Sequence, residues 1–352
     1  MTDKIKVLIV DDSSFVRVML NDILSSHPDI EVIGNAQNGK QALRLLAELT
    51  PDVITLDVEM PFMNGFETLK EFHKSETIKQ IPVIMCSSLT ASGTEATLKA
   101  LELGAFDFIQ KPENNNFHGL KDDIYSKVLG AAAARKSRRP MTTIQRIQQA
   151  ATVKIPEKKA IKSSSTIKTV VISISTGGPA SLNSVIPYIP ANLNARFLVI
   201  QHMPAKFTEA LAERLNKISL TQVSEAKDGE EIKVGNIYIA PGNYHMCINS
   251  HNKVVLNQGP TVCGVRPSAN VTLKSCVEVY GKDIISVVMT GMGNDGTDGT
   301  VLVKQQGGYC IAQDEQTSVI YGMPKSVVKA GLADEIVPLQ QIADRIVSAV
   351  SR

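Results

Sequence analysis

The sequence predicts an α/β protein of two domains, each built on a parallel sheet. Short apolar runs alternate with amphipathic stretches, as strands buried on both faces alternate with helices. This alternation stops over residues 126–167 and then resumes. The chain has 352 residues, which is enough for two or three domains of about 150 residues each. We therefore expect an N-terminal domain at 1–125, a linker at 126–167 and a C-terminal domain at 168–352.

Five apolar runs are the expected strands of the N-terminal domain. They lie at residues 6–11, 30–34, 53–58, 82–87 and 106–110. The stretches between them fit helices; for example, residues 39–50 carry three leucines on one helical stripe. Because β-α units repeated in this way form parallel sheets, we predict a parallel, five-stranded, doubly wound sheet.

The expected linker differs from both flanking segments in composition and charge. It has four consecutive alanines, a Gln-rich polar stretch and no aromatic residue, and a helix is expected near residues 141–151. From Arg135 to Lys168 there are ten Lys/Arg and one acid, Glu157, so this segment carries +9 and the rest of the chain −7. Because the linker has no helix-turn-helix pattern, a DNA-binding protein is a weaker alternative, and we expect no nucleic-acid partner.

Six further apolar runs are the expected strands of the C-terminal domain. They lie at residues 169–175, 195–201, 235–240, 253–257, 284–290 and 308–313. The middle pair, 235–240 and 253–257, is expected to form an antiparallel excursion, because turn-type sequences flank it. The chain ends in an expected amphipathic helix near residues 340–350.

The composition excludes several classes of protein. At 43% apolar and 20% charged residues, it is that of an ordinary globular chain. No apolar run approaches the roughly 18–20 residues of a membrane span, and the acidic N-terminus does not fit a signal peptide. The five cysteines form no C-x-x-C pair. We expect free thiols, a cytoplasmic protein and no direct membrane insertion.

Polar residues end the expected strands of the N-terminal domain. Asp11 and Asp12 follow the first strand, Asp57 ends the third, Ser87 the fourth and Lys111 the fifth. Functional groups gather at the carboxyl ends of parallel strands, so these side chains should converge. Converging carboxylates need a cation, and their oxygens suit Mg²⁺. One carboxylate could then attack phosphorus, with the lysine and the serine holding the phosphoryl oxygens.

The segment at residues 4–125 resembles a response-regulator receiver domain. The motifs that carry the resemblance are V-D-D-S near the start, L-D-V-E-M-P around Asp57, S-S at Ser87–Ser88 and K-P at Lys111. The resemblance implies a flavodoxin-like fold and phosphorylation of Asp57 by a histidine kinase. It also implies a Mg²⁺ site made by Asp11, Asp12, Asp57 and the backbone carbonyl of Glu59. Phe108 lies where such domains often carry a switch aromatic, and a simple core role fits it equally well.

A serine, a histidine and an aspartate follow strands of the C-terminal domain. Ser175 opens S-T-G-G-P at a strand-to-helix turn, where it could be a nucleophile, part of a phosphate site or a helix N-cap. His202 follows the next strand and could be its base, with His245 as the rival. Asp295 lies in the loop after the strand at 284–290 and could orient the histidine.

The loop G-M-G-N-D-G, which contains Asp295, also matches G-x-G-x-x-G. Asp314 lies 21 residues after Gly293, about where a ribose-binding acid would fall. A dinucleotide-dependent oxidoreductase is therefore an alternative. It rests on a single short motif late in the chain, and it leaves S-T-G-G and the sequence around His202 unexplained.

Residues 168–345 resemble the chemotaxis protein-glutamate methylesterases, the CheB family. The motifs that carry the resemblance are I-S-T-G-G, V-I-Q-H-M-P, Y-I-A-P-G, R-P-S at Arg266–Ser268 and T-G-M-G-N-D-G. The resemblance implies a Rossmann-like parallel α/β esterase domain with an antiparallel excursion. Departures occur at Ser173–Ile174, Cys263–Gly264 and Asn270, and none of them falls on Ser175, His202 or Asp295.

This second resemblance implies the residue roles and the reaction. Ser175 is the nucleophile, His202 the general base and Asp295 the orienting acid. Backbone N–H groups near Thr176, Gly177 and Met292 would stabilise the oxyanion, and Arg266 would attract an acidic receptor helix. The substrates are glutamate methyl esters on methyl-accepting chemoreceptors, and receptor glutamines are deamidated. No cofactor is expected for the esterase reaction.

The order of the two domains suggests control of one by the other. We expect the unphosphorylated receiver to cover the serine site, and phosphorylated Asp57 to weaken that interaction. A coupling of about 1–3 kcal/mol would give an activation of roughly 5–150-fold.

Overall fold

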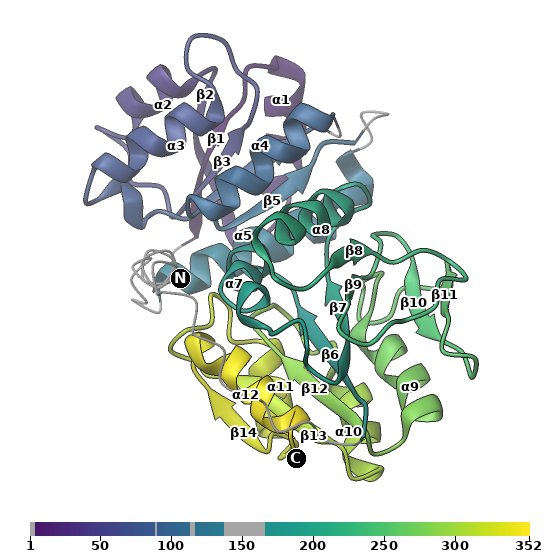
Figure 1. Cartoon of the computed structure of the whole chain (residues 1–352). Helices are drawn as coiled ribbons and strands as arrows, with labels where there is room; N and C mark the ends of the chain where they lie inside the picture. Colours follow the sequence, from purple (N-terminus) through teal and green to yellow (C-terminus); the bar gives the residue numbers. More distant parts are fainter. Residues whose placement is uncertain (1–3, 89, 113–116, 137–165) are drawn as a thin grey trace. The chain divides into compact units, whose positions relative to one another are not determined.

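The chain forms two compact units, Met1–Gln145 and Arg146–Arg352, in a computed structural model that describes residues 4–88, 90–112, 117–136 and 166–352. Each unit holds a parallel sheet with helices connecting its strands (Figure 1). The helix expected near residues 141–151 lies outside the described residues.

The sheet of the first unit has five parallel strands in the order β2-β1-β3-β4-β5. The strands are β1 (Ile5–Val10), β2 (Ile30–Ala36), β3 (Val53–Asp57), β4 (Val83–Ser87) and β5 (Asp107–Gln110). The prediction of a five-stranded, doubly wound sheet is confirmed. The direction of winding reverses beside β1, so the loops after β1 and β3 lie next to each other at the carboxyl edge.

Helices connect these strands, and their first residues show why they begin where they do. They are α1 (Ser14–Ser25), α2 (Gly39–Leu45), α3 (Gly65–Lys74), α4 (Ala91–Glu102) and α5 (Lys121–Lys136), with short 3-10 helices η1 (Ile78–Gln80) and η2 (Phe117–Leu120). Asn64 and Glu67 form a reciprocal capping box at the start of α3, which satisfies two backbone N–H groups.

Helix α5 corrects the expected start of the linker. Residues 126–136, which the sequence placed in the linker, continue α5 as far as Lys136. The four alanines are strong helix formers, and two of them, Ala131 and Ala132, are buried and extend the buried face that Ile124 and Val128 begin. Arg135, in the last turn of α5, forms an ion pair with Asp52 in which Nη1 lies 3.2 Å from Oδ1. This pair holds the end of α5 against the first domain.

The sheet of the second unit has seven parallel strands in the order β14-β13-β12-β6-β7-β9-β8. The strands are β6 (Lys168–Ile174), β7 (Ala195–Gln201), β8 (Val223–Glu225), β9 (Ile237–Ile239), β12 (Ile284–Val288), β13 (Tyr309–Gln313) and β14 (Glu335–Val337). The helices are α7 (Gly178–Asn183), α8 (Phe207–Ile218), α9 (Ala269–Tyr280), α10 (Thr297–Gln305), α11 (Met323–Lys329) and α12 (Ile342–Val350), with η3 (Ile186–Tyr188) and η4 (Leu339–Gln341). The expected final helix is confirmed.

The antiparallel excursion is present, but its first strand was misassigned. The hairpin consists of β10 (His245–Ile248) and β11 (Val254–Asn257). The run at 235–240 instead supplies β9, which pairs in parallel with β7 and β8. Strand β9 has three residues, which is too short for periodicity to reveal its partner.

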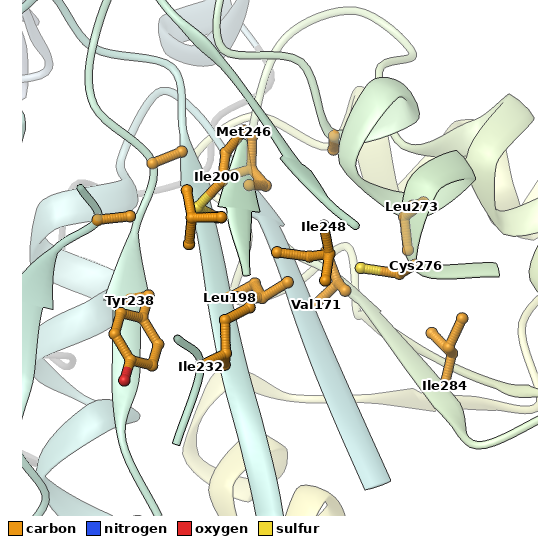
Figure 2. Packing of buried hydrophobic residues seen from close by; sticks show 14 of the residues in the cluster. Val171, Leu198, Ile200, Ile232, Tyr238, Met246, Ile248, Leu273, Cys276 and Ile284 are labelled. Atoms are coloured by element: carbon orange, nitrogen blue, oxygen red, sulfur yellow. The ribbon is translucent and has the colours of Figure 1, made fainter. Parts of the chain in front are cut away.

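The hairpin packs on the main sheet through a shared apolar core. Met246 and Ile248 of β10 lie in one buried cluster with Leu198 of β7, Tyr238 of β9 and Leu273 of α9 (Figure 2). Helix α9 also contacts β6 and β12. Because this core fixes α9 against the middle of the sheet, the N-terminus of α9 has a defined position.

Among the described residues, none of the helices has both the length and the apolar character needed to cross a membrane.

Candidate functional site

Three adjacent strands of the second sheet bring the expected serine, histidine and aspartate to one edge. Ser175 directly follows β6, His202 directly follows β7, and Asp295 lies in the loop after β12. Strand β6 pairs with β7 on one side and with β12 on the other. The winding reverses here, at the position where α/β sheets usually bind ligands.

Backbone hydrogen bonds fix the two loops that carry the serine and the histidine. The N–H of Ser175 donates to the carbonyl oxygen of Thr290 at 3.0 Å, and the N–H of His202 donates to that of Ile174 at 3.1 Å. Backbone hydrogen bonds alone therefore hold the three strand ends together.

His202 and Asp295 form a direct pair. The distance from His202 Nε2 to Asp295 Oδ2 is 2.8 Å, and the side chains are 9% and 2% exposed. The ionised carboxylate accepts, so Nε2 donates and Nδ1 is the nitrogen with a free lone pair. His202 can therefore act as a base through Nδ1. Ser175, which follows the neighbouring strand, is half-buried.

Asp295 receives three more hydrogen bonds, all from the start of α9. The Ser268 hydroxyl donates to Oδ1 at 2.7 Å, the Ala269 N–H to Oδ2 at 2.7 Å and the Asn270 N–H to Oδ1 at 3.1 Å. Burial favours the neutral acid, but the hydrogen bonds from His202, Ser268 and Ala269 outweigh it and lower the pKa of Asp295. The carboxylate thus stays charged in a buried position.

Gln201 links the backbone at the serine to the backbone at the histidine. Its side chain is 2% exposed, and Nε2 donates to the carbonyl oxygens of Ser175 and His202 at 3.1 Å each. Sequence reasoning missed Gln201 and Ser268. The available signals were a polar residue at the end of an apolar strand and a serine just before a helix.

Glycines in G-M-G-N-D-G shape the loop that carries Asp295. A Cβ on Gly291 would lie 2.7 Å from the Ser175 Cβ and 2.4 Å from Met323 Sδ, so a side chain there would displace Ser175. Gly296 adopts φ +90° at the N-cap of α10, a conformation that favours glycine. Both glycines therefore have roles within the fold, without a pyrophosphate.

The residues expected to stabilise the oxyanion come from two segments. Two of them follow Ser175 in the sequence, and the third lies in the loop that carries Asp295. Thr176 and Gly177 follow Ser175 directly, and the Thr176 carbonyl accepts a hydrogen bond from Thr290 Oγ1 at 3.0 Å. Met292 follows Gly291, whose added Cβ would contact Ser175, and is half-buried.

Arg266 is engaged in the loops around the site. Its guanidinium donates to the carbonyl oxygens of Gln258 and Gly259 at 3.0 and 2.7 Å, and to Asn243 Oδ1 at 2.7 Å. These bonds give Arg266 a role in bracing the loops. Attraction of a substrate by its charge remains an expectation.

The two competing assignments have other local roles. His245, the rival base, lies in β10 outside the parallel sheet, and its Nε2 donates to the carbonyl oxygen of Pro260 at 3.0 Å. Asp314 Oδ1 accepts from the N–H and the hydroxyl of Thr317 at 2.9 and 2.6 Å. The acid that a dinucleotide site would need for the ribose therefore closes a turn.

The acids of the first domain also meet. Asp11, Asp12 and Asp57 offer oxygens that all lie within 4.8 Å of one another. Lys111 Nζ lies 2.8 Å from both Asp11 Oδ2 and Asp57 Oδ1. Burial raises the pKa of Asp57 to about 7, against the opposing effect of Lys111. Three carboxylates and one ammonium group leave net negative charge, so this donor set fits a Mg²⁺ ion.

The remaining receiver residues lie around this cluster. Glu59 is exposed and follows Asp57 by two positions. The Ser87 hydroxyl donates to the carbonyl oxygens of Ser88 and Gly93 at 3.1 Å each. Phe108 is buried at 3% exposure, and its carbonyl accepts a hydrogen bond from Lys127 Nζ at 2.7 Å. Phe108 thus occupies a core position in this structure.

Comparisons with known proteins match both halves of the chain. The family model for CheB methylesterase matches residues 170–346, and the model for the response regulator receiver domain matches residues 7–118. The protein-glutamate methylesterase/protein-glutamine glutaminase of Pyrococcus abyssi is 44% identical, over 99% of this chain and 94% of the relative. The protein of the same description from Bacillus subtilis is 43% identical, over 99% of each.

A solved structure matches the second half. It is the crystal structure of the Thermotoga maritima CheB methylesterase catalytic domain, with 45% identity and a TM-score of 0.51. The match covers 52% of this chain and 98% of that structure.

Proposed function

We propose that this chain, which belongs to the CheB methylesterase family and carries a response regulator receiver domain, catalyses hydrolysis through Ser175, His202 and Asp295. The chain is a protein-glutamate methylesterase and protein-glutamine glutaminase of bacterial-type chemotaxis. The observation that carries the assignment of the three residues is the 2.8 Å pair between His202 Nε2 and Asp295 Oδ2, formed beside Ser175 at three adjacent strand ends.

The acylation step uses the free nitrogen of His202. Nδ1 takes the proton of the Ser175 hydroxyl as Oγ attacks the ester carbonyl, and Asp295 stabilises the imidazolium that forms. Backbone N–H groups near Thr176, Gly177 and Met292 donate hydrogen bonds to the carbonyl oxygen and stabilise the negative charge that develops on it. The imidazolium then protonates the leaving methoxide, and methanol departs.

Hydrolysis of the acyl-enzyme restores the free serine. His202 takes a proton from water, the resulting nucleophile attacks the acyl carbon, and the proton returns to Ser175 Oγ as glutamate leaves. A receptor glutamine follows the same route, with ammonia as the leaving group. His202 carries each proton between Ser175, water and the leaving group, so we propose no cofactor for this reaction.

The receiver domain would control this chemistry through Asp57. Asp11, Asp12, Asp57 and the backbone carbonyl of Glu59 would hold Mg²⁺, which supplies positive charge for a transferring phosphoryl group. An Asp57 oxygen would attack phosphorus, and the Lys111 ammonium, already 2.8 Å from that carboxylate, would pair with the phosphoryl oxygens. Ser87 and Phe108 would change their contacts in response.

The partners follow from this chemistry. A chemotaxis histidine kinase would be the phosphodonor, and the cytoplasmic helices of methyl-accepting chemoreceptors would be the substrate. We place the reaction in the cytoplasm.

We further propose that the unphosphorylated receiver inhibits the esterase. Deleting residues 1–150 should then raise activity above that of the unphosphorylated full chain; a fragment that is no more active would rule out inhibition.

A fluorophosphonate probe tests the serine assignment. It should label the chain at Ser175, and the Ser175→Ala variant should take up no label. Labelling that persists in that variant, or a wild-type chain that takes up no label, would contradict the proposal. The second outcome is what a dinucleotide-dependent oxidoreductase would give.

A further inference from the structure

Ser268 occupies the N-cap position of α9, but its side chain does not cap the helix. A serine at this position usually accepts a hydrogen bond from an N–H in the first turn. Among the residues that the structure describes, no N–H of α9 donates to the Ser268 hydroxyl. The hydroxyl is fully buried and donates instead to Asp295 Oδ1 at 2.7 Å. This serine is therefore directed at the catalytic acid.

The Asp295 carboxylate caps the helix in place of Ser268. It accepts the N–H groups of Ala269 and Asn270, the first two residues of α9. Each carboxylate oxygen thus receives two donors: Oδ2 from His202 and Ala269, and Oδ1 from Ser268 and Asn270. Four donors in fixed positions prevent the carboxylate from rotating, and the helix N-terminus favours its negative charge.

We propose that Ser268 is a positioning residue of the esterase, whose hydroxyl holds Asp295 in the orientation that faces His202 Nε2. This inference rests on the proposed serine mechanism. Asp295 acts most strongly when His202 becomes an imidazolium, which happens during the reaction and not on substrate binding. Loss of the Ser268 hydroxyl should therefore lower kcat and leave KM unchanged.

The pH profile gives a second signature of this role. His202 and Cys263 are titratable groups beside Asp295, and the exposed Asp298 of α10 lies close to Cys263. Burial raises the pKa of the Cys263 thiol, so Cys263 stays neutral and the acid limb reports the His202–Asp295 pair. Removing a hydroxyl donor from the carboxylate increases the proton affinity of the pair. The acid limb should then move to higher pH.

Three variants of the full-length chain test the proposal, with methanol release from a methyl-esterified chemoreceptor as the assay. Ser268→Gly removes the hydroxyl and places at the N-cap a residue type that this position tolerates well. Ser268→Thr keeps a hydroxyl. Ser275→Ala is the matched control, because that serine lies in the same helix and accepts the Ile248 N–H at 3.0 Å, away from Asp295.

We expect Ser268→Gly to lower kcat about tenfold at unchanged KM and to shift the acid limb upward, while the other two variants stay near wild type. Wild-type kcat and acid limb in Ser268→Gly would overturn the proposal. So would an equal loss in Ser268→Thr or Ser275→Ala, because a general effect on α9 would then explain the result. Thermal unfolding of each variant shows whether its folded population is intact.

Two further assays separate this proposal from the proposed function. If wild-type protein releases no methanol, or if Ser175→Ala releases it normally, the serine mechanism itself fails. If wild-type protein is active, Ser175→Ala is inactive and Ser268→Gly is unaffected, the mechanism stands and the role of Ser268 fails.

Discussion

Nε2 of His202 lies 2.8 Å from Oδ2 of Asp295, so the two ring nitrogens of the histidine have different tasks. Nε2 donates a hydrogen bond to the carboxylate, and Nδ1 would be the base in the proposed mechanism. The Asp295 carboxylate accepts four hydrogen bonds, two on each oxygen. This arrangement makes the acid, the base and the start of α9 one hydrogen-bonded unit, and the predictions below follow from it.

Asp295→Asn should lower kcat about 10⁴-fold. An amide NH₂ facing His202 would donate to Nε2, which would place the histidine proton on Nδ1 and remove the base. The opposite amide orientation would point NH₂ at the hydroxyl of Ser268 and the N–H of Asn270. Asp298→Asn, which changes an exposed acid three residues later, is the control and should be fully active. Methanol release measures both, and equal activity of the two variants would refute the assignment.

Asp295 should also make the stability of the chain depend on pH in the acid range. Its pKa in the folded chain is lowered from the ordinary 3.8, so the ionised carboxylate stabilises the fold above that value. The contribution is lost as the pH falls through the folded pKa. The difference in unfolding free energy between wild type and Asp295→Asn should therefore shrink from pH 6 to pH 3. Urea unfolding measures it, and a constant difference would show that Asp295 has an ordinary pKa.

Gln201→Met should impair turnover even though the methionine side chain is similar in size to that of glutamine. The change removes both hydrogen bonds that join the backbone at Ser175 to the backbone at His202. A displacement of about 1 Å between reacting groups can cost roughly 10²-fold in rate, and we expect a loss of kcat of that order. Gln305→Met, at an exposed position in α10, is the control. A variant with wild-type kcat would show that Gln201 only fills space.

Mg²⁺ should bind the receiver more tightly as the pH rises through neutrality. Without a cation, burial raises the pKa of Asp57 to about 7, so the site holds a proton at lower pH that Mg²⁺ must displace. Titration of Mg²⁺ at pH 6 and pH 8, followed by calorimetry, should show tighter binding and less proton release at pH 8. Equal affinity at both values would contradict the raised pKa of Asp57.

Phosphorylation by a small acyl phosphate should require both Asp57 and Mg²⁺. Asp57→Asn, or removal of Mg²⁺ with a chelator, should abolish phosphate incorporation. Asp122→Asn, an exposed acid in the first turn of α5, is the matched control and should incorporate phosphate normally. Incorporation that persists in Asp57→Asn would place the acceptor elsewhere.

The positions of Asp57, Ser175 and His202 could be predicted because the apolar runs define the strands. Each of these residues ends or follows a strand that is buried along its length. Parallel sheets bring such ends together, so short-range sequence patterns were enough to place them.

Other features depend on contacts that no local pattern records. Strand β9 is defined by its partners β7 and β8, and the sequence therefore could not separate it from the hairpin. The roles of Gln201 and Ser268 come from neighbours 26 and 27 residues away along the chain. Helix α5 continues through four alanines, a segment without large apolar residues that would have predicted its burial.

The most direct test of the central claim is methanol release from a methyl-esterified chemoreceptor by wild type and Ser175→Ala, each with and without a small acyl phosphate and Mg²⁺. We predict release by the wild-type chain, a rise of roughly 5–150-fold with the phosphodonor, and a loss on the order of 10⁴–10⁶ in Ser175→Ala. Methanol release by Ser175→Ala at the wild-type rate would contradict the account.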